Sequence, residues 1–243
     1  MPKGSLVRCW WCGDDAEYVR YHDTEWAVPV SDDRRLFEKL SLEGFQSGLS
    51  WITILRKRAA FRAAFADFDP MVVARFGTRD VTRLLGDAGI VRHRGKIEAV
   101  INNARTYAEL VEREGSLARF VWGFAPERQA VRRRREDVPS VTHESTAMAK
   151  ELRRRGWRFV GPTTAYAFFQ AMGLVNDHLD TCFRHEEIAA LRSRTTLPTS
   201  APARPSSRTA LRAPPARADA LGDHQGAGHR RSSAPDTCRA SGR

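Results

Sequence analysis

Residues 89–96 read Gly-Ile-Val-Arg-His-Arg-Gly-Lys and connect two segments in which apolar residues recur at helical spacing. At the start of the second segment the first backbone N–H groups of a helix would be unpaired and the helix dipole positive, and Arg92, Arg94 and Lys96 would add charge. Gly95 would permit a close approach of the backbone. The pattern is typical of a helix-hairpin-helix element, which holds a nucleic-acid phosphate without reading base sequence. An ordinary helical hairpin with a basic surface turn is the alternative.

The rest of the chain predicts an all-α fold around this element. The segment after the connector carries one apolar stripe, formed by Ile97, Val100, Ile101, Ala104, Tyr107 and Val111. Capping residues predict that other helices begin at 31–33, at Asp69-Pro70 and at Thr78, and that two more run over 145–155 and 162–173. Alternating runs of β-branched residues with hairpin turns are absent from the sequence, so a sheet has little to form from. We expect Trp122, Trp157, Phe168 and Phe169 in the core.

The composition changes at about residue 192. Residues 193–243 contain six Pro, nine Arg and three Asp and have no aromatic residue, so they carry more than half of the net charge of +11. Such a segment cannot bury enough apolar surface to become ordered. We therefore expect a helical domain over 1–192 and a disordered Pro/Ala/Arg-rich tail over 193–243. The remaining positive charge is compatible with a nucleic-acid partner, although a basic run such as Arg132 to Arg135 is most simply solvent-exposed.

The sequence offers neither a signal peptide nor a stretch of eighteen apolar residues. We therefore expect a cytoplasmic protein without a membrane partner. In that compartment thiols stay reduced, so the four cysteines are expected to be buried or to bind metal rather than to form disulfides.

Cysteine and histidine residues near both ends of the predicted domain could form a metal site. His178 and Cys182 are spaced i, i+4, so they would share one face if the segment after Asp177 is helical. Cys9 and His22 would complete a closed Cys2His2 set, which suits structural zinc rather than an open catalytic site. Spacing alone leaves Cys12 and His185 as alternative ligands, and buried free cysteine as the simplest interpretation.

Many short segments form a combined pattern between about residues 8 and 183. They are Arg8-Cys9, Tyr21-His22-Asp23, Glu25-Trp26, Val28-Pro29, Leu42-Glu43-Gly44, Gly48-Leu49-Ser50-Trp51-Ile52-Thr53, Asp87-Ala88-Gly89-Ile90, Arg92 to Ile97, Asn103-Ala104-Arg105, Phe120-Val121-Trp122, Phe159-Val160-Gly161, and Gly173 to His178 with Cys182. Together they resemble the bacterial 3-methyladenine DNA glycosylase I family. The resemblance implies an α-helical fold of the helix-hairpin-helix glycosylases. It also implies a structural zinc ion that joins the two ends of the domain through Cys9, His22, His178 and Cys182.

The resemblance also implies a base pocket and a DNA-binding surface. Glu43 corresponds to the carboxylate that hydrogen-bonds an extruded base, and Trp51 to the aromatic residue that stacks on it. The pocket would include Tyr21 and Trp11, with Tyr18 and Trp26 as weaker candidates. The expected DNA contacts are Gln46 and Leu49, which would fill the gap left in the duplex, and Arg92, Arg94, Gly95 and Lys96 at the phosphate backbone. Without the resemblance, Glu43 would be taken as a surface carboxylate and Trp51 as a core residue.

Two positions depart from the family pattern. Ala27 stands where the family typically has glycine, which would cost stability if the position needs a positive φ. Phe45 stands where a polar residue is common beside Gln46.

The implied reaction is hydrolysis of the N-glycosidic bond of 3-methyladenine in double-stranded DNA during base-excision repair. Alkylation at N3 leaves a cationic base that is already a good leaving group, and aromatic faces add a cation–π term of about 1–2 kcal/mol when desolvated. No lysine is assigned to a Schiff base, so we expect a monofunctional enzyme that leaves an abasic site, and by default a monomer without an obligate protein partner. A non-catalytic DNA-binding module and a zinc hydrolase are the competing hypotheses. The second would need an open metal position that Cys9 closes.

Overall fold

The structure of the protein is a computed structural model that describes residues 6–196 and 198. Within these residues all regular structure is helical, apart from an isolated bridge between Arg132 and Leu179. The helices are η1 (Trp10–Cys12), α1 (Ala16–Thr24), α2 (Asp33–Gln46), α3 (Trp51–Ala64), η2 (Ala66–Phe68), α4 (Pro70–Val73), α5 (Thr78–Gly86), α6 (Arg94–Glu114), α7 (Leu117–Trp122), η3 (Arg135–Asp137), α8 (His143–Arg154), α9 (Pro162–Ala171) and α10 (Arg184–Arg194). The predicted all-α class is confirmed.

Side-chain caps explain where several helices begin. The Asp32 carboxylate accepts the Arg35 N–H at the start of α2, and Asp69 accepts two N–H groups at the start of α4, as the sequence predicted. At α5 the prediction was off by one residue. Gly77 is the cap, and its N–H is bound by the side chain of Asp80, whereas Thr78 is already helical.

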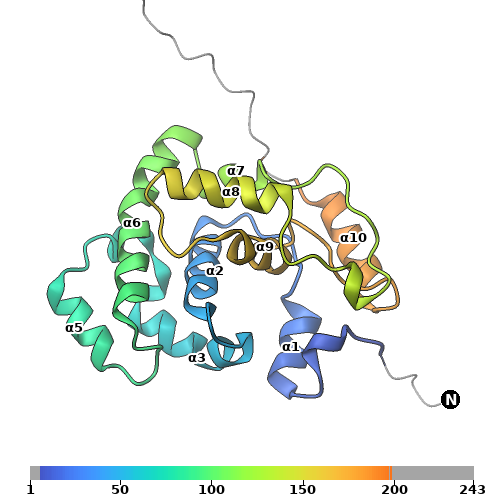
Figure 1. Ribbon diagram of the computed structural model, residues 1–243, viewed down its shortest axis with the longest axis horizontal. Helices are drawn as coiled ribbons and strands as arrows, with labels where there is room; N and C mark the ends of the chain where they lie inside the picture. Colours follow the sequence, from blue (N-terminus) through green and yellow to red (C-terminus); the bar gives the residue numbers. More distant parts are fainter. Residues whose placement is uncertain (1–5, 197, 199–243) are drawn as a thin grey trace, which may run out of the picture. The chain divides into compact units, whose positions relative to one another are not determined.

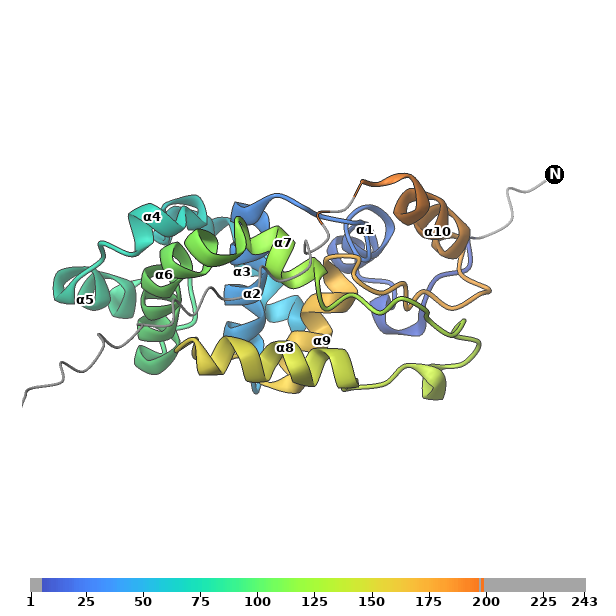
Figure 2. The same ribbon diagram turned by 90° about the horizontal axis from the view of Figure 1, so that it is seen from above.

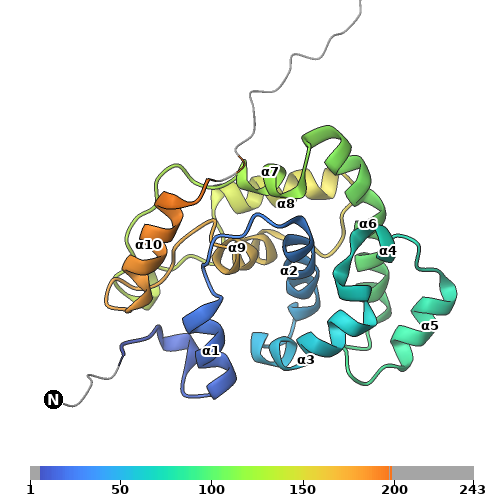
Figure 3. The ribbon, with the colours of Figure 1, turned by 180° about the vertical axis from the view of Figure 1, so that it is seen from behind.

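The long helix α2 lies at the centre of the domain and packs against α3, α7 and α9 (Figure 1). Its buried face includes Leu36, Phe37 and Leu40. In all three views α4, α5 and α6 lie at one end of the domain, and α1 and α10 lie at the other (Figures 2 and 3). The four aromatic residues expected in the core are buried there. Residues far apart in sequence therefore meet around α2 and α9.

The predicted domain boundary at residue 192 falls inside α10, which continues to Arg194. Nearly all of the predicted tail lies outside the described residues. Among the described helices, none combines the length and apolar character needed to cross a membrane.

Candidate active site

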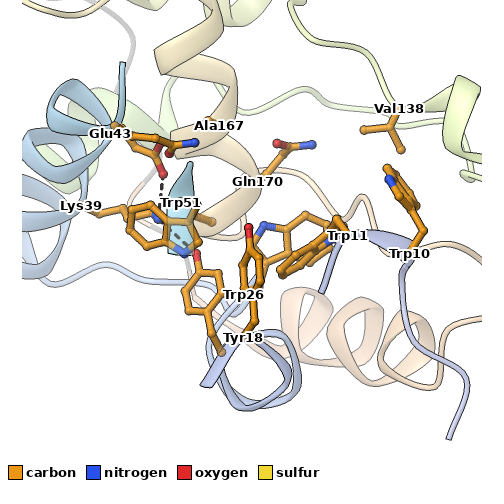
Figure 4. Close-up of a pocket in the computed structure, with 13 residues that line it drawn as sticks. Trp10, Trp11, Tyr18, Trp26, Lys39, Glu43, Trp51, Val138, Ala167 and Gln170 are labelled. Atoms are coloured by element: carbon orange, nitrogen blue, oxygen red, sulfur yellow. Dashed lines mark hydrogen bonds and ion pairs between the residues drawn. The ribbon is translucent and has the colours of Figure 1, made fainter. Parts of the chain in front are cut away.

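A cavity of about 250 Å³ opens between η1 and α1 on one side and α2, α3 and α9 on the other. Figure 4 shows Glu43, Lys39 and Trp51 at one end of this cavity and Trp10 with Val138 at the other. The lining residues are Trp10, Trp11, Tyr18, Tyr21, Trp26, Lys39, Glu43, Gln46, Trp51, Val138, Ala167, Gln170 and Ala171. The structure thus brings together all six residues that the sequence assigned to a base pocket.

Aromatic rings from η1 and α1 form one wall of the cavity. The ring of Trp11 lies edge-on to Tyr18 and Trp26, with centroids 5.1 Å and 4.9 Å apart. Tyr21 lies against Trp51 from α3, with centroids 5.4 Å apart. The buried indole N–H groups of Trp11 and Trp51 have no acceptor among the described residues. The wall can therefore enclose a flat, polar ring and still has donors to offer to it.

The polar end of the cavity is a buried cluster around Glu43. Lys39 lies one helical turn before it on α2, and its Nζ is 2.7 Å from Glu43 Oε1. The same ammonium donates to the hydroxyl of Tyr21 at 3.1 Å and lies 3.1 Å from the ring centroid of Trp51. Glu43 is therefore not an exposed carboxylate but half of a buried ion pair next to the stacking face of Trp51.

Burial shifts the titration of two neighbours of Glu43. Burial raises the pKa of Tyr21 well above its ordinary value, and the negative charge of Glu43 adds to the rise. Burial lowers the pKa of Lys39, and the attraction of Glu43 opposes that shift. Tyr21 is therefore a neutral phenol near neutral pH.

The turn between α2 and α3 carries the residues expected to enter DNA. Gln46 ends α2 and lines the cavity, and Leu49 follows with 43% of its surface exposed. Gly48 between them has a φ of 80°, which glycine adopts without strain. Leu49 is thus an exposed apolar side chain that lies between the cavity-lining residues Gln46 and Trp51 in sequence.

The basic connector at 89–96 is placed beside this turn by Lys96. Its side chain is buried, and Nζ donates to the carbonyls of Phe45 at 2.9 Å and Ser47 at 2.5 Å. The expected contact between the Lys96 side chain and a DNA phosphate does not fit these bonds, because the ammonium already holds the end of α2. Arg92 and Arg94 are exposed, and Arg94 pairs loosely with Glu98 at 3.3 Å.

His93 and Gly95 shape the start of α6. The Nδ1 atom of His93 accepts the Lys96 N–H and so caps the helix. A Cβ at Gly95 would lie 3.3 Å from the His93 ring, so a larger residue here would require the ring to shift slightly. His93 therefore organises the connector rather than facing the cavity.

A second cluster joins the two ends of the domain. One ligand atom from each of Cys9, His22, His178 and Cys182 lies within 4.8 Å of the others, and all four residues are buried. Cys9 Sγ is 3.5 Å from His178 Nδ1, and Cys182 Sγ is 3.5 Å from His22 Nε2. The set could hold a metal ion in a closed four-ligand site, which leaves no position for a catalytic water and disfavours the zinc-hydrolase alternative.

The remaining nitrogen of each histidine has its own partner. His22 Nδ1 lies 2.8 Å from Asp23, which Arg8 also binds, and His178 Nε2 lies 3.4 Å from the carbonyl of Trp26. Such outer partners fix the ring orientation of metal-binding histidines. A hydrogen bond from the Cys9 thiol lowers the pKa of Cys182, and the histidines act in the same direction. A metal ion bound here would take the place of the thiol protons.

The structure decides two points of the cluster that spacing in the sequence left open. His178 and Cys182 do not lie on a helix: a turn closed by the Cys182 N–H and the carbonyl of Leu179 brings them together, and α10 begins only at Arg184. The two alternative ligands lie outside the set of four. Cys12 donates to the carbonyl of Cys9, and His185 bonds the carbonyl of His178.

The two departures from the family pattern have clear structural settings. Ala27 is fully buried and has a φ of 63°. The position therefore has the positive φ at which alanine, unlike glycine, costs stability. Phe45 points into the core, where its ring packs on Phe61 at a centroid distance of 4.6 Å. Phe45 therefore does not take part in the exposed turn that follows it.

The sequence missed Lys39 and Gln170 as site residues. Lys39 could have been found from its i, i+4 spacing to Glu43, which places both on one face of α2. Gln170 lines the cavity and donates to Asp177, a fully buried carboxylate that also accepts from Tyr166 and Arg132. Arg132 was expected in solvent, but this ion pair buries most of it.

The model of one protein family, described as methyladenine glycosylase, matches residues 11–185. The chain belongs to this family. The methyladenine glycosylase "DNA-3-methyladenine glycosylase 1" of Escherichia coli K12 is 48% identical over 179 residues, which span 73% of this chain and 96% of that protein. A crystal structure of 3-methyladenine DNA glycosylase I has 48% identity and a TM-score of 0.71, and covers 74% of this chain and 100% of the other.

A variant of 3-methyladenine DNA glycosylase I in complex with 3-methyladenine has 35% identity and a TM-score of 0.70, over 73% of this chain and 97% of the other. Its fold, and that of the crystal structure above, matches the helical domain described here. The match to the methyladenine glycosylase family thus spans most of the helical domain.

Proposed function

We propose that this methyladenine glycosylase removes 3-methyladenine from double-stranded DNA by hydrolysing the N-glycosidic bond, leaves an abasic site and does not cut the strand. One observation carries the proposal. The cavity is walled by aromatic rings on one side and closed by the Glu43 cluster at its end, with a volume of about 250 Å³ that suits a single purine base. Relatives named for this activity share nearly their whole length with the chain.

Base binding in the proposal uses the two faces of the cavity. Trp51 and Tyr21 stack on the extruded base, while Trp11, Tyr18 and Trp26 complete the wall. Glu43 accepts a hydrogen bond from the exocyclic amino group of the base. An enzyme must take a base out of the duplex to reach the bond at C1′, because the bond is inaccessible inside the stack.

DNA binding in the proposal uses the turn after α2 and the connector before α6. Leu49 and Gln46 enter the space vacated by the base. Arg92 and Arg94, with the free N–H groups at the start of α6, hold a phosphate of the same strand. Lys96 fixes the distance between these two surfaces through its bonds to Phe45 and Ser47.

The reaction is a heterolysis followed by addition of water. The bond between C1′ and N9 breaks with its electron pair going to N9, so the cationic base leaves as neutral 3-methyladenine. Water adds to the sugar cation at C1′ and releases a proton to solvent. Because alkylation makes the base a good leaving group, no strong general acid is needed, and Tyr21 and Glu43 act by positioning the base.

The structural ion in the proposal is zinc, held by Cys9, His22, His178 and Cys182. Two thiolates and two imidazoles are a donor set that zinc binds tetrahedrally. When bound, the ion holds the segment that carries Trp11 against the segment before α10, and so keeps the aromatic wall in place.

The first prediction tests the pocket with Glu43→Gln. We expect the wild-type protein to release 3-methyladenine from methylated duplex DNA without nicking it. We expect Glu43→Gln to be at least about tenfold slower in single turnover, because a neutral amide makes a weaker hydrogen bond to the base than a carboxylate and positions the base less firmly. Chromatography of released bases and a denaturing gel of the strand measure the two products.

Glu112→Gln, on the exposed side of α6, is the matched control and is expected to keep full activity. DNA binding without any base release would favour the non-catalytic binding module instead. A Lys39-dependent strand break would contradict the monofunctional mechanism.

A further inference from the structure

The ammonium of Lys39 occupies the position that a cationic base would seek. It is buried, pairs with Glu43 at 2.7 Å, donates to Tyr21 and lies 3.1 Å from the ring centroid of Trp51. A carboxylate, a phenol oxygen and an indole face are the groups that stabilise a cation in a desolvated site. In the free protein these three groups already contact a cation, the ammonium of Lys39.

The surroundings of Lys39 leave Glu43 as its carboxylate partner. On the other side of Lys39 a small cavity of about 40 Å³ is lined by further charged residues. There Arg58 pairs with Glu25 and Arg62 pairs with Glu38. Each of these carboxylates is matched by its own arginine, so Lys39 and Glu43 neutralise each other and the pocket has no excess negative charge.

This charge balance acts on the glycosidic bond because charge moves during the reaction. Before cleavage the positive charge lies on the alkylated base. In the transition state it passes to the sugar, and the base departs neutral. A negative pocket would stabilise the bound cation more than the transition state and so raise the barrier. A positive charge beside the base has the opposite effect.

We propose that Lys39 is a specificity-determining residue, which matches the pocket to the neutral leaving base rather than to the cationic base of bound DNA. The inference rests on the proposed function, because it assumes that the base stacks on Trp51 next to Glu43. The lesion is then selected by the weakness of its glycosidic bond and by the shape of the aromatic wall, not by a pocket that holds cations.

The test compares two purines of nearly equal size that differ in charge. Free 3-methyladenine is the neutral ligand, and the 3,9-dimethyladenine cation is the permanently charged one. Calorimetry gives the dissociation constant of each for the wild type and for Lys39→Met, whose side chain is unbranched, of similar length and uncharged. Lys150→Met, an exposed position on α8, is the matched control for the loss of one positive charge.

We expect Lys39→Met to shift the ratio of the two dissociation constants toward the cation by at least about tenfold, because one unit charge a few Å away is removed from a partly screened site. Lys150→Met is expected to leave the ratio unchanged. In single turnover Lys39→Met is expected to bind methylated DNA more tightly but to release the base more slowly. Tighter binding together with slower release indicates an effect of charge, because a loss of structure would weaken both.

Two further variants keep the test decisive if Lys39→Met folds poorly. Lys39→Gln removes the charge with a polar side chain and is expected to shift the ratio in the same direction, whereas Lys39→Arg keeps the charge and is expected to retain the wild-type ratio. An unchanged ratio in every uncharged variant, with both ligands still bound, would overturn the inference alone. If the wild type binds neither purine, or if Trp51→Ala binds them equally well, the proposed pocket and the inference both fail.

Discussion

At the scale of single residues, Gly173 shows how the base pocket depends on close backbone packing. It follows α9 with a φ of 76°, and a Cβ there would lie 2.6 Å from Pro29 N and 2.7 Å from the carbonyl of Ala27. The segment 26–30 passes over this glycine on its way from α1 to α2, and Val30 donates to the carbonyl of Met172. The position of Trp26 in the aromatic wall is therefore tied to the end of α9.

A second prediction follows for Gly173→Ala. We expect it to lower the free energy of unfolding by more than about 2 kcal/mol, because the added methyl group meets rigid backbone atoms and the left-handed conformation is strained for alanine. Denaturation in urea measures the change. Gly86→Ala at the end of α5, where a Cβ meets nothing within 4 Å, is the control and is expected to change stability by less than about 1 kcal/mol. Equal stabilities of the two variants would contradict the packing argument.

Single residues also mark where sequence reasoning failed. Glu43, Trp51 and the aromatic residues of the wall were predicted through motifs, because each motif is a short, continuous stretch of sequence. The burial of Lys39 depends on how α2 meets α1 and α3, so local sequence does not reveal it. The bonds of the Lys96 ammonium were not predicted either, because its acceptors Phe45 and Ser47 lie about fifty positions earlier in the chain.

At the scale of helices, Lys96 connects two elements with separate tasks. Its ammonium satisfies two carbonyls at the end of α2, which lack partners within the helix. The start of α6, with its free N–H groups, is thereby held beside the turn that carries Leu49. This arrangement predicts that Lys96 affects the geometry of DNA binding rather than its charge.

The third prediction separates these two roles by the salt dependence of binding to DNA that contains an abasic site. We expect Arg92→Ala to reduce the slope of log affinity against log salt by about one, as the loss of one phosphate contact does. We expect Lys96→Met to weaken binding while leaving the slope unchanged, and to lower the free energy of unfolding by about 1–3 kcal/mol through the two orphaned carbonyls. A reduced slope in Lys96→Met would restore the direct phosphate contact.

Helix boundaries were largely predictable because the signals that define them are local. Asp32 and Asp69 cap α2 and α4 within four residues of sequence. The sequence left open whether the segment after Asp177 is helical, although His178 and Cys182 have helical spacing. A turn brings the two side chains together as a helix would, and the spacing alone does not distinguish a turn from a helix.

At the scale of the whole domain, the Cys2His2 cluster lies on the same elements as the aromatic wall. Cys9 precedes η1 and His22 lies in α1, so both elements that carry wall residues are anchored at the cluster. Trp11 also lies 5.3 Å from the ring of His22. The cluster and the base pocket therefore share one structural unit.

A fourth prediction concerns the metal itself. We expect one zinc ion per chain in purified protein by elemental analysis, and its loss in Cys9→Ser, with lower thermal stability and weaker binding of free 3-methyladenine. Cys12→Ser is the matched control, since this thiol is equally buried but lies outside the cluster. We expect it to keep the metal. Loss of metal in Cys12→Ser with retention in Cys9→Ser would reverse the ligand assignment.

The distance in sequence between the two halves of the cluster also has a consequence for synthesis of the protein. Cys9 and His178 are 169 positions apart, although their ligand atoms are 3.5 Å apart. A chain growing on the ribosome exposes its N-terminal part first, and domains form as their segments emerge. Until Cys182 has left the exit tunnel, the wall formed by Trp11 and Tyr18 has no anchor. The connector before α6 is complete some eighty residues earlier, so the growing chain contains its basic connector well before the last cysteine that anchors the aromatic wall.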